Sequence, residues 1–498
     1  MRVAVIGAGF GGLGMAIRLR QEGITDFVVL ERAGDVGGTW RDNTYPGCQC
    51  DIPSHLYSFS FAPNPDWTRF FPLQEEIWDY LRRCAREYGI EPHLHLETEL
   101  DDAGWDDETA RWTLRTSRGT LTADVVVAAV GALSEPAVPP LEGLQDFAGT
   151  VFHSATWDHD HDLRGERVAV IGTGASAIQF VPRIQPLVDR LELFQRTPAW
   201  ILPHPDRPVT ERGRRLFRRF PATQRAMRAG IYAVLEARAL GFTVEPRILR
   251  LAELQAERHL ARQVPDPELR RALRPSYRLG CKRVLLSDDF YPAVAQPNVD
   301  LVRAPISRVT PSGIVTAEGA EHELETIIFA TGFRVSEMPA ALRVHGRDGR
   351  SLAEAWRGSP QAYVGTTIAG FPNLFMLMGP NTGLGHNSVV YMIESQLAYV
   401  LDALAAMRAR AAASVEVRPE VQAGYNAEVQ QRLEGTVWAT GCKSWYQDSH
   451  GRNTALWPGF TFGFRRRTRR FAPADYVLEQ RALVAAEPEP EREVARTV

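Results

Sequence analysis

The chain has 498 residues, of which 44% are hydrophobic and 23% are charged, and its formal net charge is -3. This length is too great for one hydrophobic core and predicts two or three lobes. A nearly neutral charge gives no reason to expect nucleic acid or an anionic membrane as a partner, and no apolar run approaches the ~20 residues of a spanning helix.

The N-terminus and the cysteines indicate the cellular compartment. Met1 leads directly into a strand pattern, so we expect no signal peptide. The five cysteines form no metal-ligand spacing and no Cys-x-x-Cys pair; they are Cys48, Cys50, Cys84, Cys281 and Cys442. We therefore predict reduced thiols, no metal site and a cytoplasmic protein without stable membrane insertion.

The chain begins with a pattern typical of a nucleotide-binding unit. A strand, a glycine-rich loop, a helix and a second strand are predicted at residues 2–6, 7–12, 13–21 and 27–30. The loop places Gly7, Gly9 and Gly12 in the pattern Gly-x-Gly-x-x-Gly, which permits a tight turn and a close approach of backbone to a pyrophosphate. The helix that follows directs free N–H groups at the phosphates.

Glu31 follows the second strand directly. It lies about 20 residues beyond the loop, where a dinucleotide fold places its acidic ribose ligand. A carboxylate at this position accepts hydrogen bonds from both ribose hydroxyls and repels a 2′-phosphate. The first unit is therefore predicted to bind FAD or NAD rather than NADPH.

Residues 37–51 argue against a class of enzymes that carry the same glycine-rich loop near their N-terminus. In pyridine nucleotide-disulfide reductases a redox cysteine follows a Gly-Gly pair, and its partner comes five residues later. Trp40 and Tyr45 occupy those positions here, while Cys48 and Cys50 are separated by one residue, which is a poor geometry for a disulfide. The chain is therefore not expected to be a disulfide reductase.

The next segment completes the first lobe. A helix is predicted at 73–88, and strands are predicted near 93–100, 112–116 and 123–130. The last of these strands is a continuous apolar run, which is typical of a buried parallel strand. Pro136, Pro139 and Pro140 then mark the exit from the domain.

A second nucleotide-binding unit follows, with a strand, a loop and a further strand at 167–171, 172–177 and 191–194. Ala177 replaces the third glycine of the loop, a substitution that the helix-packing position allows. Where the first unit carries Glu31, this unit carries Gln195 with Arg196 beside it. A guanidinium here would hold a 2′-phosphate in bidentate fashion, so the second unit is predicted to bind NADPH.

Residues from about 205 to 278 alternate arginines with apolar residues in apparent helices, for example at 211–220 and 224–240. We interpret this segment as an insertion in the nicotinamide domain. Basic amphipathic helices can lie on membranes, but a solvated helical lid is the favoured interpretation. The hypothesis is that this lid shapes substrate access.

Lys282 and Arg283 form the next candidate site. Only two of the 57 basic residues are lysines. This bias suggests that Lys282 occupies a position where an arginine could not replace it, because a compact ammonium and a planar guanidinium bind differently. A buried strand is predicted at 325–333, and it ends in Ala-Thr-Gly-Phe. This ending resembles the motif at which the chain of two-dinucleotide flavoproteins returns to the FAD-binding domain. A helix at about 389–407 could direct its N-terminal dipole at a flavin.

The stretch from 147 to 158 separates the two nucleotide loops. It spells Phe-x-Gly-x-x-x-His-x-x-x-Trp-Asp, with the fixed positions at Phe147, Gly149, His153, Trp157 and Asp158. This stretch resembles the fingerprint of type I Baeyer–Villiger monooxygenases, which are flavoproteins. The run Gly-Gly-x-Trp-x-x-x-x-Tyr-Pro-Gly-x-x-x-Asp at 37–51 resembles a second motif of that family, and the resemblance extends to Trp445.

The resemblance implies an α/β fold with two dinucleotide-binding, Rossmann-like domains. An FAD-binding domain at 1–140 and 321–485 is split by an NADPH-binding domain at 141–320, which carries the helical insertion at about 205–278. The fingerprint would then couple the two domains as a hinge. Residues 486–498 are polar and charged and are expected to form a disordered tail.

The resemblance also implies site residues. The residues expected at FAD are Gly7, Gly9, Gly12, Glu31, Thr39, Trp40, Asp51, Tyr57 and Val389. Those expected at NADPH are Gln49, Thr173, Gly174, Ala175, Ser176, Gln179, Arg196, Thr197, Lys282, Arg283 and Trp445. Arg283, oriented by Asp51, is the expected catalytic pair, whereas Trp445 is as consistent with a core residue.

The activity implied is insertion of one oxygen atom beside a ketone carbonyl, through a flavin peroxide, to give an ester or lactone. FAD and NADPH are the expected cofactors, and a small ketone and molecular oxygen are the expected partners, with the oligomeric state left open. A flavin monooxygenase that oxygenates nitrogen or sulfur is the alternative, although those enzymes usually lack the final Trp157-Asp158 pair. A non-catalytic flavin-binding redox sensor is a further possibility.

Overall fold

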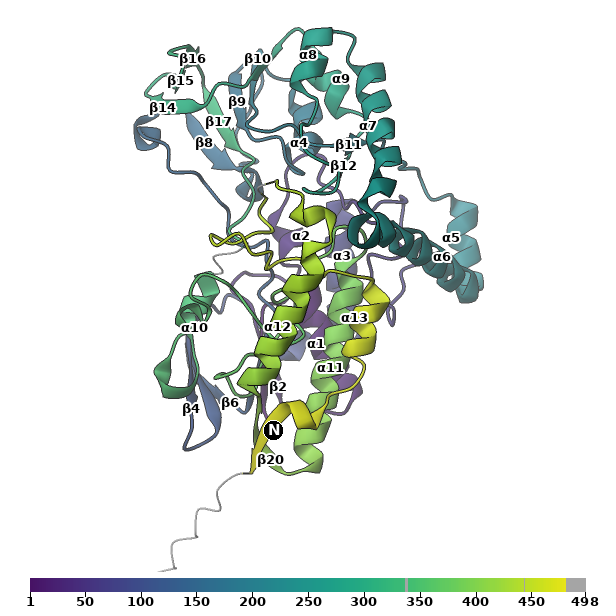
Figure 1. Cartoon of the computed structure of the whole chain (residues 1–498), viewed down its shortest axis with the longest axis vertical. Helices are drawn as coiled ribbons and strands as arrows, with labels where there is room; N and C mark the ends of the chain where they lie inside the picture. The colour runs from purple at the N-terminus through teal and green to yellow at the C-terminus, as the bar shows by residue number, and fades with distance from the viewer. Residues whose placement is uncertain (336–338, 443, 481–498) are drawn as a thin grey trace, which may run out of the picture.

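The computed structural model describes residues 1–335, 339–442 and 444–480, which form two five-stranded sheets with helices around them (Figure 1). The tail predicted at 486–498 lies outside the described residues. The two sheets lie at opposite ends of the long axis in Figure 1, and two helices of the insertion, α5 (Glu211–Arg219) and α6 (Pro221–Ala239), extend to one side between them.

The first sheet is parallel and has the strand order β19-β7-β1-β2-β3. Its strands are β19 (Leu374–Met376), β7 (Val125–Ala128), β1 (Val3–Ile6), β2 (Phe27–Leu30) and β3 (Leu94–His95). Alternate side chains of β1 enter two different hydrophobic cores. Val3 and Val5 pack in one core, and Ala4 and Ile6 pack in the other. Because both faces are covered, the strand is apolar at every position.

One face of the first sheet is covered by helices. The other face is covered by a smaller, mostly antiparallel sheet. The helices are α1 (Phe10–Gln21), α3 (Gln74–Glu87) and α11 (Val389–Ala409), and the covering strands are β18 (Val344–His345), β4 (Leu100–Asp106), β5 (Arg111–Thr116) and β6 (Gly119–Ala123). The single strand predicted at 93–100 was wrong, because the chain divides there into β3 and β4, which belong to different sheets.

Helix α11 is long and apolar enough to cross a membrane by length and composition alone. However, 56% of its most apolar window is buried inside the protein. It packs along α1, where a Cβ added to Gly14 would lie 2.9 Å from the Leu397 side chain. Its apolar sequence is therefore explained by its place in the core.

The second sheet is also parallel, with the order β13-β10-β9-β17-β8. Its strands are β13 (Val299–Val302), β10 (Arg190–Phe194), β9 (Arg167–Ile171), β17 (Thr326–Phe329) and β8 (Thr150–His153). One face packs on α4 (Ala177–Ile184) and α9 (Phe290–Val294), and the other on the antiparallel strands β14 (Ile306–Thr310), β15 (Gly313–Thr316) and β16 (Glu321–Glu323).

The strand predicted to belong to the second part of the FAD-binding domain lies in the second sheet instead. β17 pairs with β9 and β8, so the chain leaves the second sheet after Phe329 and not at residue 321. Its apolar run is buried in either place, which is why the sequence could not assign it. The outgoing and returning linkers then run together, with Ala137 N donating to Gly332 O at 2.8 Å and Arg334 N to Glu135 O at 2.9 Å.

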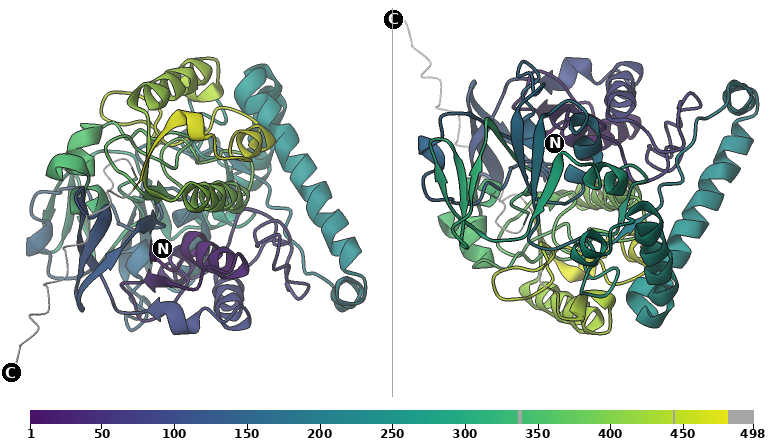
Figure 2. Two further views of the ribbon diagram at one scale, coloured as in Figure 1. Left: turned by 90° about the horizontal axis from the view of Figure 1, so that it is seen from below. Right: turned by 90° about the horizontal axis from the view of Figure 1, so that it is seen from above.

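The helical insertion contains four α-helices: α5 (Glu211–Arg219), α6 (Pro221–Ala239), α7 (Arg250–Gln263) and α8 (Pro267–Ala272). It is attached to the second sheet's domain through the short strands β11 (Ile201–Leu202) and β12 (Leu285–Leu286). The C-terminal part adds α10 (Leu352–Trp356), α12 (Pro419–Glu434), α13 (Thr461–Arg467) and the pair β20 (Ala412–Val417) and β21 (Tyr476–Gln480). Figure 2 shows α6, in teal, along the outer edge of the molecule.

The prediction of five reduced cysteines was wrong for two of them. Cys281 and Cys442 form a disulfide, with their Cα atoms 6.2 Å apart and 161 positions apart in the sequence. The other three, Cys48, Cys50 and Cys84, are free and buried. Burial raises the pKa of the Cys48 thiol to about 12, which agrees with the exclusion of a redox cysteine pair at 48 and 50.

We expect reduction of the disulfide to lower the thermal unfolding midpoint by several degrees. A crosslink over so long a loop restricts the unfolded chain, and its loss costs about 2–5 kcal/mol. Differential scanning fluorimetry with and without a reductant measures the shift. The Cys281→Ser, Cys442→Ser double variant is the control and should not respond to the reductant. Titration of five thiols in unreduced, denatured protein would contradict the crosslink.

Candidate active site

The first nucleotide loop has the geometry that a pyrophosphate needs. Gly7 has φ +97°, and a Cβ at this residue would lie 2.7 Å from the Ala129 carbonyl oxygen. A Cβ on Gly12 would lie 1.7 Å from the Gly7 carbonyl oxygen. Gly9 is the N-cap of α1 and makes no side-chain capping bond, so the first N–H groups of the helix are left for a phosphate.

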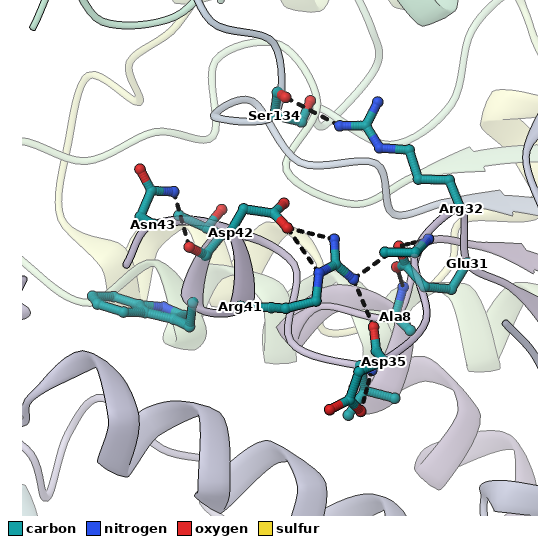
Figure 3. A network of polar contacts seen from close by, with 12 residues as sticks. Ala8, Glu31, Arg32, Asp35, Arg41, Asp42, Asn43 and Ser134 are labelled. Carbon is teal, nitrogen blue, oxygen red and sulfur yellow. Dashed lines mark hydrogen bonds and ion pairs between the residues drawn. The ribbon is translucent and has the colours of Figure 1, made fainter. Parts of the chain in front are cut away.

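Glu31 lies at the end of β2 with a side chain that is buried and already bonded (Figure 3). Its carboxylate accepts from the Ala8 N–H at 2.8 Å and from the Ala33 N–H at 3.0 Å. Arg41 pairs with it at 3.0 Å. The bond to Ala8 joins the acid directly to the glycine loop, which places it where a ribose would lie beside the pyrophosphate.

Trp40 and Tyr57, both expected at the flavin, touch each other. Thr39 and Trp40 open the short helix α2 (Thr39–Asp42), and the Trp40 indole N–H donates to the Tyr57 hydroxyl at 3.0 Å. The Tyr57 ring also meets Phe10 edge to face at 5.2 Å. Burial raises the pKa of Tyr57 well above its ordinary value, so the phenol stays neutral.

Asp51 and Arg283, which lie 232 positions apart in the sequence, are bonded to each other. Arg283 Nε donates to Asp51 Oδ2 at 3.0 Å, Arg283 Nη2 also donates to this oxygen, and Arg283 Nη1 donates to the Leu384 carbonyl at 3.2 Å. The charge of Asp51 raises the pKa of Arg283 and outweighs the opposing effect of burial. The guanidinium is therefore a permanent cation whose orientation is fixed on two sides.

The two side chains keep an accessible side. Arg283 is 31% exposed and Asp51 33% exposed, although the surrounding protein strongly desolvates the guanidinium. Tyr446 is buried close to the same charges, and its pKa is raised by burial to about 12. A neutral phenol, a fixed cation and its counter-ion therefore share one partly open site.

Gln49 and Gln179 join the two domains. The Gln179 side-chain amide donates to the Gln49 carbonyl at 2.9 Å and accepts from the Gln49 N–H at 3.3 Å. The same amide oxygen accepts from the Tyr45 hydroxyl at 3.0 Å. Both glutamines were predicted at NADPH, and the structure brings them together at the boundary between the domains.

The second nucleotide loop is open at its glycine. A Cβ on Gly174 would meet no atom within 4 Å, and Gly174 and Ala175 are exposed. Ser176 is the N-cap of α4 and makes no side-chain bond to the helix. Thr173 Oγ1 donates to the Thr197 carbonyl at 3.4 Å, which holds the loop against the end of β10. The loop residues Gly174 and Ala175 thus lie open before the N-terminus of α4, where a pyrophosphate could approach.

Arg196 and Lys282 approach each other from different parts of the chain. Arg196 follows β10 and is exposed, whereas the preceding Gln195 is buried and donates to the Ala272 carbonyl at 3.0 Å. Burial and repulsion from Arg196 lower the pKa of Lys282. An anion between two such cations relieves their repulsion, so this pair fits a phosphate group.

The fingerprint forms one edge of the second sheet. Phe147 precedes β8, and a Cβ on Gly149 would lie 2.1 Å from the Glu325 carbonyl oxygen, so only glycine fits there. Trp157 packs edge to face on Phe152 at 5.1 Å. Asp158 accepts the N–H of Asp160 at 3.0 Å in a local turn.

His153 ends β8 beside the paired linkers. It is 5% exposed, and its Nδ1 accepts from the Ala155 N–H at 3.0 Å. Its ring meets Phe333, on the returning linker, at 6.0 Å. Burial lowers the pKa of His153 and favours the neutral imidazole. The predicted hinge role stays a hypothesis, with the linker contact as its support.

Trp445 is 48% exposed and packs on Tyr446 with ring centroids 4.4 Å apart. It is therefore not a core residue. The segment that carries it is joined to the Arg283 loop by the Cys281–Cys442 disulfide. Its predicted contact with the nicotinamide remains a prediction.

Val389, the remaining residue predicted at FAD, is the first residue of α11. Ser388 caps this helix by accepting the Val390 N–H at 3.3 Å, and Ser388 Oγ lies 3.5 Å from the Leu56 carbonyl, beside Tyr57. The N-terminus of α11 is thus close to the segment predicted to border the flavin.

Sequence reasoning missed several residues of the site. Arg41 pairs with Glu31, the Leu384 carbonyl orients Arg283, and Tyr446 lies buried near the same guanidinium. Their sequence signal is weak, because an arginine after a tryptophan and a leucine between glycines are common. Only the folded chain shows which site residue each of them contacts.

Comparisons with known proteins support the same picture. A family model described as pyridine nucleotide-disulphide oxidoreductase matches residues 4–200. A Baeyer–Villiger monooxygenase from Pseudomonas aeruginosa is 54% identical over 487 residues, which cover 97% of this chain and 92% of the relative.

Solved structures agree over the whole fold. An oxidised steroid monooxygenase bound to NADP superposes with a TM-score of 0.85 at 31% identity, covering 96% of this chain and 99% of the other. A complex of OTEMO with FAD and NADP gives a TM-score of 0.87 at 26% identity, with the same coverage. The two nucleotide loops therefore have counterparts in structures that hold both cofactors.

Proposed function

Because the chain belongs to the family of Baeyer–Villiger monooxygenases, we propose that Arg283 and Asp51 are the pair that serves its oxygen-insertion step. The observation that carries this proposal is the fixed guanidinium of Arg283. It is bonded to Asp51 at 3.0 Å and to the Leu384 carbonyl at 3.2 Å. The substrate class proposed is a small ketone, and the product an ester or lactone.

The bound flavin, reduced by NADPH, supplies the activation of molecular oxygen. The residues of the chain supply the environment. Arg283 stabilises negative charge that develops on oxygen, because a preoriented cation in a desolvated site loses little energy to reorganisation. Asp51 keeps the guanidinium in place. Tyr446, with its raised pKa, remains neutral and adds no competing negative charge.

The first loop and Glu31 hold FAD in this proposal. Its pyrophosphate would lie against Gly7, Gly9 and the N-terminus of α1, with the ribose at Glu31 and Arg41 (Figure 3). Thr39, Trp40 and Tyr57 would border the isoalloxazine. The bond between the Trp40 indole and the Tyr57 hydroxyl fixes both rings before the cofactor binds.

The second loop, Arg196 and Lys282 hold NADPH in this proposal. The exposed N–H groups at Gly174 and Ala175 would take the pyrophosphate, and the two cations the 2′-phosphate. Gln49, Gln179 and Trp445 would border the nicotinamide half of the cofactor.

The function is tested by NADPH oxidation against a panel of ketones, with the products identified by mass. We expect the appearance of an ester or lactone that is heavier than the ketone by one oxygen atom and matches the NADPH consumed. A panel of sulfides and amines is assayed in parallel. Oxygenation of sulfides or amines without turnover of any ketone would favour the alternative activity, and NADPH consumption without any oxygenated product would contradict both.

Replacing Arg196 with alanine is expected to raise the KM for NADPH about 10- to 100-fold, with little change for NADH. The variant loses hydrogen bonds between charged groups, each of which contributes about 1.5–3 kcal/mol. Steady-state kinetics with both nucleotides measures the change in preference.

Arg190 is the matched control for Arg196. It lies at the opposite end of β10 and pairs with Asp300 at the surface. Arg190→Ala should leave the preference for NADPH intact. An Arg196→Ala enzyme that still prefers NADPH over NADH as strongly as the parent enzyme would overturn the assignment of the phosphate site.

The cellular setting follows from the chemistry. We propose a cytoplasmic enzyme, because NADPH is supplied in that compartment, and we propose no nucleic-acid partner and no stable membrane insertion. The buried position of α11 supports the last point. Recovery of the activity in the membrane fraction after cell disruption would argue against this location.

A further inference from the structure

Helix α6 of the insertion carries a line of polar side chains at every fourth residue. They are Gln224, Arg228, Tyr232 and Glu236, and we refer to them as the α6 seam. Residues at this spacing share one face of a helix. Buried Ile231 and Leu235 flank the line, so this face is a contact surface and not the solvated face of a lid.

The first half of the α6 seam bonds to the first lobe of the chain. Gln224 Nε2 donates to the Asn64 carbonyl at 2.6 Å. Arg228 Nη1 donates to the carbonyls of His55 at 2.8 Å and Ser58 at 3.0 Å. In the sequence the insertion is part of the nicotinamide domain. In the structure, however, these bonds attach α6 to the FAD-binding domain.

Glu236 ends the α6 seam with a buried carboxylate, 6% exposed. Its oxygens accept from the Thr461 N–H at 2.5 Å, the Thr461 hydroxyl at 2.7 Å and the Asn387 side-chain amide at 2.6 Å. Burial raises the pKa of Glu236, but the contacts with His386, Thr461 and Asn387 outweigh it and leave the pKa below its ordinary value. The carboxylate is therefore ionised and fully engaged.

The loop that Glu236 holds, residues 384–388, also reaches the active site. At one end the Leu384 carbonyl accepts from Arg283 Nη1 at 3.2 Å. At the other end Asn387 Oδ1 accepts from the Ser388 N–H at 2.8 Å, and Ser388 caps α11. Glu236 thus bonds to the fourth residue of a five-residue loop that carries Arg283's partner, Leu384, and ends at the N-cap of the helix predicted to face the flavin.

We propose that Glu236 is a positioning residue, which fixes the 384–388 loop so that α11 and Arg283 lie correctly for FAD. This inference rests on the assignment of FAD to the first nucleotide loop. It gives the helical insertion a second role: α6 completes the flavin-binding domain from outside. Glu236 itself touches neither Arg283 nor the nucleotide loop.

The test uses Glu236→Gln in the full-length protein. Glutamine keeps the shape of the glutamate side chain but replaces one acceptor oxygen with an NH₂ donor. This donor would face the donor groups of Asn387 and Thr461, and we expect the repulsion to displace the loop. FAD is removed, and the apoprotein is titrated with FAD by flavin fluorescence. We expect the Kd for FAD to rise about 10- to 100-fold, as for the loss of hydrogen bonds to a charged group, and the flavin reduction potential to shift.

Two further variants separate positioning from folding. Asn387→Ala removes the bond between Glu236 and the loop, together with the contact of Asn387 Oδ1 to the Ser388 N–H. It should reproduce the changes in Kd and potential, even if Glu236→Gln does not fold. Tyr232→Phe removes a hydroxyl that also contacts Thr461, at 3.1 Å, but does not contact Asn387. It is the control and should bind FAD as the wild type does.

The outcomes are distinct. If Asn387→Ala and the folded Glu236→Gln variant bind FAD with wild-type affinity and potential, the positioning role is wrong. If Tyr232→Phe weakens FAD binding as strongly as Glu236→Gln, the α6 seam acts only by docking the helix, and the inference fails for Glu236. If the wild-type apoprotein does not bind FAD at all, the proposed function fails instead.

Discussion

The Arg283→Ala variant is expected to accept hydride from NADPH yet to form almost no ester. Removing the guanidinium takes away the positive charge that we propose stabilises the reacting oxygen, a loss of the kind that lowers kcat about 10²–10³-fold. The nucleotide loops and their phosphate partners are untouched. The oxygen that the variant consumes should therefore appear as hydrogen peroxide, with one NADP⁺ formed for each peroxide.

Two measurements separate the reduction of the flavin by NADPH from the formation of the ester. Anaerobic stopped-flow absorbance follows flavin reduction by NADPH, and gas chromatography with mass detection follows ester formation. Arg283→Lys keeps a positive charge but loses the paired contact with Asp51, so it should retain part of the activity. Normal ester formation by Arg283→Ala would show that its guanidinium does not serve the oxygen-insertion step.

The Gly12→Ala variant is expected to be purified without FAD. A methyl group at this position would lie 1.7 Å from the Gly7 carbonyl oxygen, which is backbone at the centre of the first loop. The loop must move to admit it, and the turn that approaches the pyrophosphate is lost. The ratio of flavin absorbance to protein absorbance in the purified variant measures the effect.

Gly230 supplies the matched control for Gly12. It lies in α6, and a Cβ there would meet no atom within 4 Å. Gly230→Ala should keep the full flavin content and stabilise the helix by about 0.5–1 kcal/mol. If Gly12→Ala retained flavin as Gly230→Ala does, the first loop would not be the FAD site.

The sequence could predict the nucleotide units because their geometry is local. A strand, a glycine turn, a helix and a strand-end acid lie within about 30 residues, and each position is required by backbone geometry or by the charge of the ligand. β1, β2, β9 and β10 formed at or within a residue of the predicted bounds. Similarity to a known Baeyer–Villiger monooxygenase confirms the predicted family and function.

The sequence could not assign an element to one of the two lobes when the element would be equally buried in both. β17 was assigned to the wrong sheet because an apolar strand fits both. The Cys281–Cys442 bond joins positions 161 apart, and no spacing rule identifies such a pair. The α6 seam could have been noticed at its four-residue spacing, but nothing local shows whether such a line faces water or another domain.

By itself, the sequence predicted the two nucleotides, FAD and NADPH, because the charges proposed to discriminate between them, Glu31 and Arg196, lie within two residues of the strand ends of their own units. Only the tertiary structure decided how Arg283 is oriented. Asp51 and Leu384 come from two segments far from Arg283 in the sequence, and their contacts with it exist only after the chain has folded. Local geometry is encoded within one turn or one strand, whereas a fixed charge between domains depends on long-range packing.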